Sequence, residues 1–199
     1  MKRLGVFGGT FDPPHNGHYN AALEFISKLE LDELLVIPTF VPPHKDRKSD
    51  TTAEERLEMT RLAFSNIPNV IVSDMEIKRG GKSYTYLTLE ELTNSDTELY
   101  FLCGTDMFLT LDKWKNPDII FNLATICCVR RETDTKNIIE LQKKFDEYKI
   151  KYNSKVIFIQ SKVIEVSSTE VREKISTSSA DIPIDPSVYD YILKKRLYI

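Results

Sequence analysis

The chain has 199 residues, 41% of them hydrophobic and 29% charged, with a formal net charge of −3. This length suits one domain over residues 1–199 with a buried core, and the acidic balance argues against a general nucleic-acid-binding protein. The N-terminus lacks the apolar region of a signal peptide, and no apolar run reaches the roughly 18 residues of a membrane helix. We therefore expect a cytoplasmic protein that binds neither nucleic acid nor membrane.

Six short apolar runs alternate with segments of helical periodicity along the chain. Near-continuous apolarity is typical of parallel strands that are buried on both faces. The predicted strands cover residues 4–7, 34–37, 70–72, 99–103, 125–129 and 156–159. The predicted helices are an amphipathic helix from 19 to 29, a helix through residues 57 and 62 with a capping box at Thr52 and Glu55, and helices over 85–92, 134–148, 168–175 and 186–195.

This alternation predicts an α/β fold with a doubly wound, mainly parallel sheet. In such sheets, ligands bind beyond the carboxyl ends of the strands, near the topological switch point. Residues 38–50, with three prolines and several charges, indicate a loop over that site. The cysteines Cys103, Cys127 and Cys128 lie in apolar runs without metal-binding spacing, and we expect them to be reduced core residues.

The segment that leaves the first predicted strand, GGTFDPPHNGH from Gly8 to His18, combines glycines with two of the chain's three histidines. Glycine allows a ligand to approach the backbone closely, and the start of the following helix favours an anion. A proline-stiffened turn without a ligand would explain the glycines but not the histidines. The GxGxxG and GxxxxGK[ST] patterns are absent, so we expect a phosphate site of another kind.

This segment resembles the (T/G)xFDPxHxGH motif of the nucleotidylyltransferase superfamily, whose HxGH histidines bind ATP phosphates. The resemblance implies a Rossmann-like fold and attack by a substrate phosphate on the α-phosphorus of ATP, with pyrophosphate leaving. The attacking group is already an anion, so catalysis can depend on positioning and charge stabilisation, without a nucleophilic side chain. The ATP contacts implied here are Gly8, Gly9, Thr10, His15 and His18.

Three further blocks resemble motifs of the same superfamily. Residues 166–172, VSSTEVR, resemble ISSTxxR at a helix start; residues 42–45, PPHK, resemble PxPPHK; and residues 104–106, GTD, resemble GxD. Each block also has a purely structural alternative. Residues 166–172 could be a helix N-cap followed by a surface arginine, Lys45 could be a solvated side chain, and Asp106 could cap a helix. These blocks add Lys45, Gly104, Asp106, Ser168, Thr169 and Arg172 to the ATP site, and the implied catalytic set is His15, His18, Lys45 and Arg172.

The middle of the chain bears on the second substrate. Residues 83–89, SYTYLTL, resemble the SYTxxTL block of bacterial nicotinate-nucleotide adenylyltransferases, and Arg56 with Met59 resembles their RxxM helix. In those enzymes, a tryptophan–aromatic pair and backbone amides hold the pyridine ring and its carboxylate. The implied contacts to the nicotinate nucleotide are Thr10, Phe11, His44, Lys45, Ser83, Tyr84, Thr85, Trp114 and Lys115.

Alternatives to this acceptor site stay open. Trp114 could pack in the core, and residues 83–85 could simply cap a helix. The chain also departs from the family, because Lys115 stands where a second aromatic residue is usual, and residues 131–133 read RET where RPG is usual.

The resemblance implies transfer of AMP from ATP to nicotinate mononucleotide, giving nicotinate adenine dinucleotide and pyrophosphate in NAD biosynthesis. We expect Mg²⁺ to accompany ATP as the cofactor, without a dedicated metal site on the protein. The expected binding partners are the two small substrates, ATP and nicotinate mononucleotide. The sequence does not decide whether the protein forms a homo-oligomer. The rivals are an adenylyltransferase for nicotinamide mononucleotide or phosphopantetheine, and a nucleotide-binding module without turnover.

Overall fold

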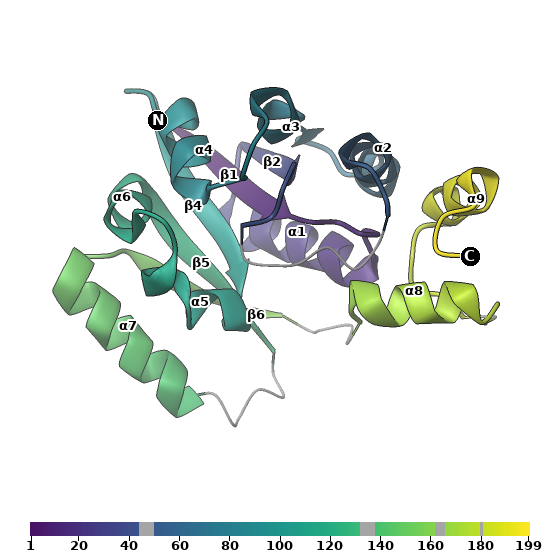
Figure 1. Cartoon of the computed structure of the whole chain (residues 1–199). Coiled ribbons are helices and arrows are strands. Elements are labelled where there is room, and N and C mark those ends of the chain that lie inside the picture. Colours follow the sequence, from purple (N-terminus) through teal and green to yellow (C-terminus); the bar gives the residue numbers. More distant parts are fainter. Residues whose placement is uncertain (44–49, 132–137, 162–165, 180) are drawn as a thin grey trace.

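A computed structural model describes residues 1–43, 50–131, 138–161, 166–179 and 181–199. Its centre is a six-stranded sheet in the order β3-β2-β1-β4-β5-β6, and all neighbouring strands are parallel (Figure 1). The predicted α/β class and parallel sheet are therefore confirmed. The strands are β1 Lys2–Gly9, β2 Glu33–Pro38, β3 Val70–Val72, β4 Thr97–Gly104, β5 Ala124–Arg131 and β6 Val156–Ser161.

Helices cover both faces of the sheet. The core on one face gathers apolar side chains from α1 (Asn16–Leu29), α2 (Ala53–Phe64), α8 (Ser168–Ser176) and α9 (Pro186–Lys195). The core on the other face receives side chains from α4 (Thr85–Leu92), α5 (Thr105–Phe108), α6 (Pro117–Leu123) and α7 (Ile138–Tyr152). Two shorter helical segments complete this set, α3 (Met75–Arg79) and the 3-10 turn η1 (Leu111–Lys113). The chain is thus doubly wound, with each face closed by its own helices.

Several predicted boundaries agree closely with the structure. Thr52 and Glu55 form the predicted capping box at the start of α2. The Thr52 hydroxyl accepts from the Glu55 N–H at 3.1 Å, and the Glu55 carboxylate accepts from the Thr52 N–H at 2.8 Å. Helices α4 and α9 have the predicted limits. The three cysteines are free and buried, as expected.

Other elements differ from the prediction. The sequence did not reveal α3, α5, η1 or α6, which have at most seven residues and are too short to establish a helical period. Helix α7 runs to Tyr152 instead of residue 148, because Tyr152 stacks on Phe121 of α6 with ring centroids 4.5 Å apart. Residues 134–137, predicted as its first turn, lie outside the described residues. No helix in the described part of the chain is long and apolar enough to span a bilayer.

The two halves of the sheet separate at the carboxyl ends of the central strands. Pairing of β1 with β2 continues to Gly9 and Pro38, and pairing of β4 with β5 continues to Gly104 and Val129. The register between β1 and β4, however, ends at Val6 and Phe101. Between these two strands the chain also switches from one face to the other, which is where doubly wound sheets form a ligand crevice.

Candidate active site

The glycines at the carboxyl ends of β1 and β4 border open space. A Cβ built on Gly8 or on Gly104 would meet no other atom within 4 Å. Both residues follow the last pair of the β1–β4 register, so they line the opening between the two halves of the sheet. The structure therefore leaves room for a ligand where the sequence predicted ATP contacts.

Phe11 turns its side chain away from this opening. Its backbone is left-handed, with φ of 50°, and its ring is 1% exposed. The ring packs edge-on against Phe7 and Phe64 at centroid distances of 5.4 and 6.1 Å. A Cβ on Gly9 would lie 2.8 Å from it. The side chain of Phe11 therefore belongs to the core, and a contact of this residue with the nicotinate nucleotide would be made by its backbone.

His15 and His18 form a stacked pair at the start of α1. Their ring centroids are 3.7 Å apart, and the His15 backbone N–H donates to Nδ1 of His18 at 3.2 Å. With Nδ1 as the acceptor, the proton of a neutral His18 ring lies on Nε2. Gly17 makes room for the pair, because a Cβ there would lie 3.0 Å from Nδ1 of His15. The spacing of the HxGH motif thus produces two adjacent imidazoles on one side of the first helical turn.

Burial keeps His15 neutral at ordinary pH. It lowers the pKa of His15 to about 4, and the nearby charge of Glu170 opposes this effect only in part. The His15 Nδ1 atom is buried and has no hydrogen-bond partner among the described residues. A neutral imidazole can donate a hydrogen bond to a phosphate oxygen but carries no fixed charge, so the positive charge of the site has to come from elsewhere.

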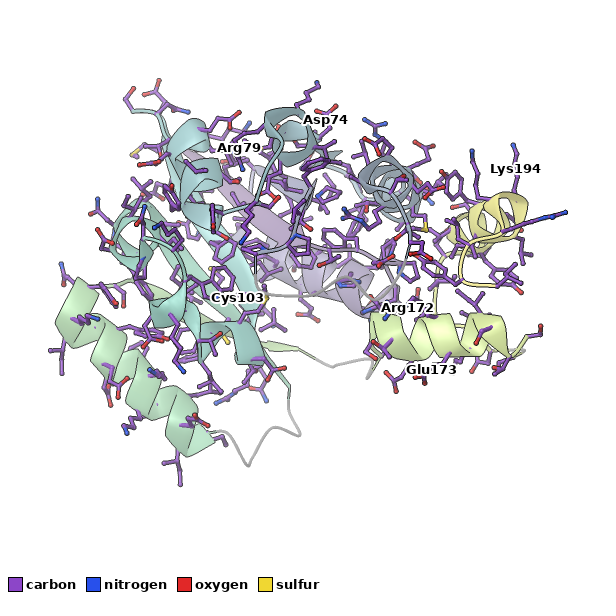
Figure 2. The ribbon with its side chains drawn as sticks, viewed as in Figure 1. Asp74, Arg79, Cys103, Arg172, Glu173 and Lys194 are labelled. Carbon is purple, nitrogen blue, oxygen red and sulfur yellow. The ribbon has the colours of Figure 1, made fainter. Side chains whose placement is uncertain are left out.

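Helix α8 attaches its first turn to the loop between β1 and α1. Ser167 caps the helix by accepting from the Glu170 N–H at 3.2 Å, and the Ser168 hydroxyl donates to the Pro13 carbonyl at 2.9 Å. The Arg172 guanidinium donates to the Asp12 carbonyl at 2.6 Å and to the Thr169 hydroxyl at 3.1 Å. Figure 2 labels Arg172 on α8. The structure thus brings the second predicted block against the first, although the residues lie about 155 positions apart.

The predicted acceptor residues lie around the start of α4 and after η1. Thr85 is the first residue of α4, and Tyr84 precedes it half-buried. Trp114 is half-buried with its ring edge-on to Phe101 at 6.2 Å, whereas Lys115 is exposed. Tyr86 and Trp114 pack against the same core, on the face covered by α4 to α7. Trp114 therefore packs against the core and remains partly exposed.

Ser83 has a structural role that the sequence did not reveal. It is 5% exposed, its hydroxyl accepts from the Phe40 N–H at 2.9 Å, and its own N–H donates to the Val41 carbonyl at 2.9 Å. It also bonds Glu76, a buried residue of α3. Burial raises the pKa of Glu76, while hydrogen bonds from Thr88 and Ser83 act in the opposite direction. Ser83 therefore joins the segment after β2 to the start of α4.

Arg56 of α2 is a second structural connection. Its side chain is fully buried, and it donates to the Thr10 carbonyl at 2.8 Å and to the Phe40 carbonyl at 3.1 Å. These contacts tie the loop after β1 to the segment after β2. Its position on the buried stripe of α2, with Leu57 and Thr60, is the signal that marks it in the sequence. A charged residue on such a stripe needs partners, and here they are backbone carbonyls.

The remaining predicted site residues are either exposed or outside the described part of the chain. Asp106 is exposed on α5, directly after Gly104 and Thr105. His44 and Lys45 lie outside the described residues, as do residues 132 and 133. Among the residues that the structure describes, no group of three or more His, Cys, Asp or Glu side chains could hold a metal ion.

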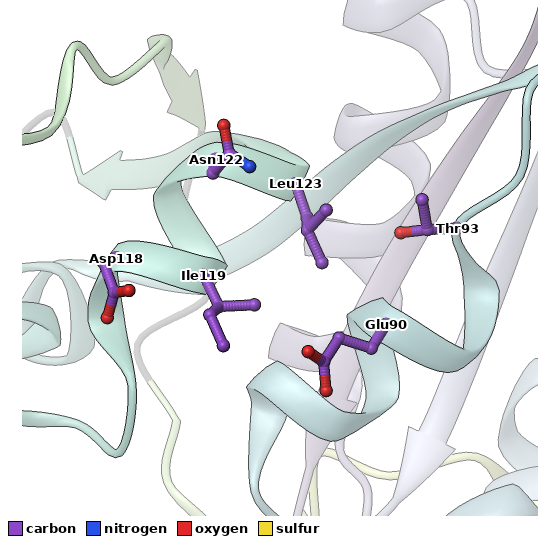
Figure 3. Close-up of a pocket in the computed structure, with 6 residues that line it drawn as sticks. All are labelled: Glu90, Thr93, Asp118, Ile119, Asn122 and Leu123. Carbon is purple, nitrogen blue, oxygen red and sulfur yellow. The ribbon is translucent and has the colours of Figure 1, made fainter.

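A shallow groove lies away from this site, between α4 and α6 (Figure 3). Its volume is about 610 Å³. It contains none of the predicted site residues and is lined by Glu90, Thr93, Asp118, Ile119, Asn122 and Leu123.

The amino-acid sequence is similar to those of known nucleotidyl-transferring enzymes. A family model described as cytidylyltransferase-like matches residues 6–174. A probable nicotinate-nucleotide adenylyltransferase of Clostridium acetobutylicum is 39% identical over 202 residues, covering 100% of both chains. Its counterpart in Clostridium novyi is 41% identical over 177 residues, covering 88% of each.

A solved structure shares the fold. Plasmodium falciparum nicotinic acid mononucleotide adenylyltransferase, complexed with NaAD, superposes with a TM-score of 0.76 at 24% identity, covering 100% of this chain and 98% of that one. Because the family model spans most of the chain and the curated relatives align with all or most of it, the chain belongs to the cytidylyltransferase-like family and, within it, to the nicotinate-nucleotide adenylyltransferases.

Proposed function

We propose that this protein transfers AMP from ATP to nicotinate mononucleotide, releasing pyrophosphate and forming nicotinate adenine dinucleotide, as a step of NAD biosynthesis. The observation that carries the proposal is the stacked His15–His18 pair at the opening between β1 and β4, in a chain 39% identical over its whole length to a nicotinate-nucleotide adenylyltransferase. The rest of the site accounts for how such a transfer could proceed.

The histidines would act as hydrogen-bond donors to the phosphates of ATP, His15 in its neutral form because burial lowers its pKa to about 4. His18 would donate through Nε2, since its Nδ1 accepts from the His15 backbone. The acceptor's phosphate attacks the α-phosphorus directly, so the bond to the attacking oxygen forms as the bond to pyrophosphate breaks. The protein's contribution is then alignment of the two substrates and stabilisation of negative charge in the transition state.

Positive charge would come from Arg172 and Lys45. Arg172 already lies against the loop between β1 and α1, one helical turn from the hydroxyls of Ser168 and Thr169. A guanidinium with planar, forked donors suits phosphate oxygens. Gly8, Gly9, Thr10, Gly104 and Asp106 would complete the ATP site from the ends of β1 and β4.

Mg²⁺ would enter with ATP and neutralise charge on its phosphates. Mg²⁺ commonly keeps substrate oxygens and water as ligands, so its binding with ATP would not require a cluster of acidic side chains on the protein. The Asp12 carboxylate is 6% exposed and accepts hydrogen bonds from the hydroxyls of Thr51 and Tyr198.

The nicotinate nucleotide would bind between the start of α4 and Trp114. The backbone N–H groups at the first turn of α4, beside Tyr84 and Thr85, suit a carboxylate, and the Trp114 indole can stack on a flat pyridine ring. We also propose the cytoplasm as the compartment, in keeping with three free, buried cysteines.

A substrate comparison tests the proposal. The purified chain is incubated with ATP and Mg²⁺, with nicotinate mononucleotide, nicotinamide mononucleotide, phosphopantetheine or no acceptor, and pyrophosphate release is measured. We expect release only with an acceptor and a higher kcat/KM for the nicotinate nucleotide. A preference for the amide or for phosphopantetheine would contradict the assigned acceptor, and binding of ATP without release in any arm would indicate a non-catalytic module.

A further inference from the structure

The C-terminal tail of the chain reaches the loop that carries the histidines. The Tyr198 hydroxyl donates to the Asp12 carboxylate at 2.6 Å, across 186 positions of sequence. A second contact comes from the segment before α9, since the Asn16 N–H at the start of α1 donates to the Pro183 carbonyl at 2.9 Å. Tyr198 lies beyond residue 174, where the family match ends, so no motif discussed above includes it.

Asp12 is the point at which four segments of the chain meet. Its Oδ1 atom accepts from the Tyr198 hydroxyl and also from the Thr51 hydroxyl, each at 2.6 Å. Its backbone carbonyl accepts from Arg172. These contacts join the loop after β1, the residue before the α2 cap, helix α8 and the C-terminal tail. Asp12 itself is buried, and a buried carboxylate depends on such donors for its stability.

The Tyr198 hydroxyl is held as a donor in this cluster. Burial and the adjacent charge of Asp12 both raise the pKa of Tyr198 far above its usual range, and the nearby charge of Arg172 opposes them. The hydroxyl thus keeps its proton and directs it at Asp12. The tail reaches this position after a sharp turn, because Arg196 and Tyr198 both have left-handed backbone conformations, with φ of 55° and 62°.

We propose that Tyr198 is a positioning residue of the ATP phosphate site, acting through Asp12. The inference rests on the proposed function. Asp12 is separated from His15 only by two prolines with restricted φ angles, so a displacement of Asp12 is transmitted to the imidazole. Without the tyrosine hydroxyl, the carboxylate loses a donor to Oδ1 and competes for the Arg172 guanidinium, which then becomes less available to ATP phosphates.

The test is removal of that one hydroxyl in the full-length chain, by Tyr198→Phe. We expect the Kd for ATP, measured by calorimetry, to rise about tenfold, the scale of one lost hydrogen bond to a charged group. We also expect kcat to fall. The KM for nicotinate mononucleotide should stay within about twofold, because the proposed acceptor residues of α4 and Trp114 pack on the opposite face of the sheet from Tyr198. A residue that merely supports the fold would lower the melting temperature and leave the ATP constants unchanged.

Tyr191→Phe is the matched control. Tyr191 lies on α9, packs partly buried against the same core, and has the Lys195 ammonium 5.9 Å from its ring centroid. Its variant should bind ATP like the wild type. Thr51→Val removes the other hydroxyl from the same oxygen and should weaken ATP binding in the same way, which keeps the test informative if Tyr198→Phe folds poorly.

A double variant tests the route of the effect. If Tyr198 acts through Asp12, then Asp12→Ala with Tyr198→Phe should bind ATP no more weakly than Asp12→Ala alone. Additive losses, or unchanged ATP binding in Tyr198→Phe, would overturn the inference. Calorimetry needs no acceptor, so weaker ATP binding in Tyr198→Phe together with a wild type that forms no dinucleotide would contradict the proposed function and leave the positioning role intact.

Discussion

At the scale of single residues, the glycines between Gly8 and Gly17 are required for different physical reasons. Gly9 and Gly17 make room for aromatic rings of the protein itself, those of Phe11 and His15. Gly8 faces no protein atom within 4 Å. A substitution at Gly8 should therefore affect the ligand alone, whereas a substitution at Gly9 should affect the fold.

Gly8→Ala and Gly9→Ala form a matched pair. For Gly9→Ala, the methyl group 2.8 Å from the buried Phe11 ring should lower the free energy of unfolding by about 1–3 kcal/mol, as overpacking does. For Gly8→Ala, the unfolding free energy should stay within about 0.5 kcal/mol of the wild type. Its kcat/KM for ATP should nevertheless fall by at least about tenfold if phosphate oxygens approach that backbone. Urea unfolding and steady-state kinetics measure both effects, and full activity of Gly8→Ala would show that ATP does not lie there.

His18 provides the test of the donor role. His18→Ala should lower turnover by at least about 100-fold, the effect of losing one transition-state donor. The ring also packs against Phe11 at a centroid distance of 5.0 Å, so the variant should lose some stability as well. His18→Gln, which keeps an N–H donor on a side chain of moderate length, should lose less activity at similar stability. Wild-type turnover in His18→Ala would mean that the donor is another residue.

At the scale of helices and strands, the sequence predicted those elements that carry a local signal, such as a capping motif or an apolar run. The capping box at Thr52 and Glu55 predicted the start of α2, and the strand runs were long enough to be recognised. The resemblance of both blocks to motifs of one superfamily implied that the loop after β1 and the start of α8 contribute to the same site, and the Ser168 hydroxyl lies against the Pro13 carbonyl of that loop. The contacts of Tyr198 with Asp12 could not be predicted, because a hydrogen bond across 186 positions leaves no periodic pattern.

Arg56 allows a prediction about how elements are joined. Arg56→Met keeps a long apolar side chain on α2 but removes the donor to the partly buried Thr10 and Phe40 carbonyls. We expect the free energy of unfolding to fall by about 2–4 kcal/mol, since the loss of two charged hydrogen bonds outweighs the gain from no longer burying a charge. Arg56→Lys, which cannot reach both carbonyls as a planar fork does, should have an intermediate value. Equal stability of Arg56→Met and wild type in urea unfolding would contradict this role.

At the scale of the whole molecule, the site arises from the way the sheet is wound. The loop after β1, α8 and the tail pack on one face of the sheet, and α4, α5 and Trp114 pack on the other. The sequence indicated this class of fold, because buried strands alternating with helices have few other arrangements. It did not indicate the strand order, since the rule for right-handed crossovers does not say on which side of β1 the fourth strand adds.

The buried histidine should also affect the stability of the whole molecule. Burial lowers the pKa of His15 from 6.5 to about 4, so between these values the unfolded chain binds a proton that the native chain does not. Stability is therefore lost as pH falls from 6.5 towards 4, by about 2 kcal/mol at pH 5 for this group alone. His15→Asn keeps a residue that suits the N-cap of α1 and removes the titration. Urea unfolding of both proteins at pH 5, 6 and 7 should show a shallower loss of stability in the variant, with the difference between the two curves confined to pH values below about 6.5. Identical curves would mean that the native His15 ring takes up its proton as readily as an exposed histidine.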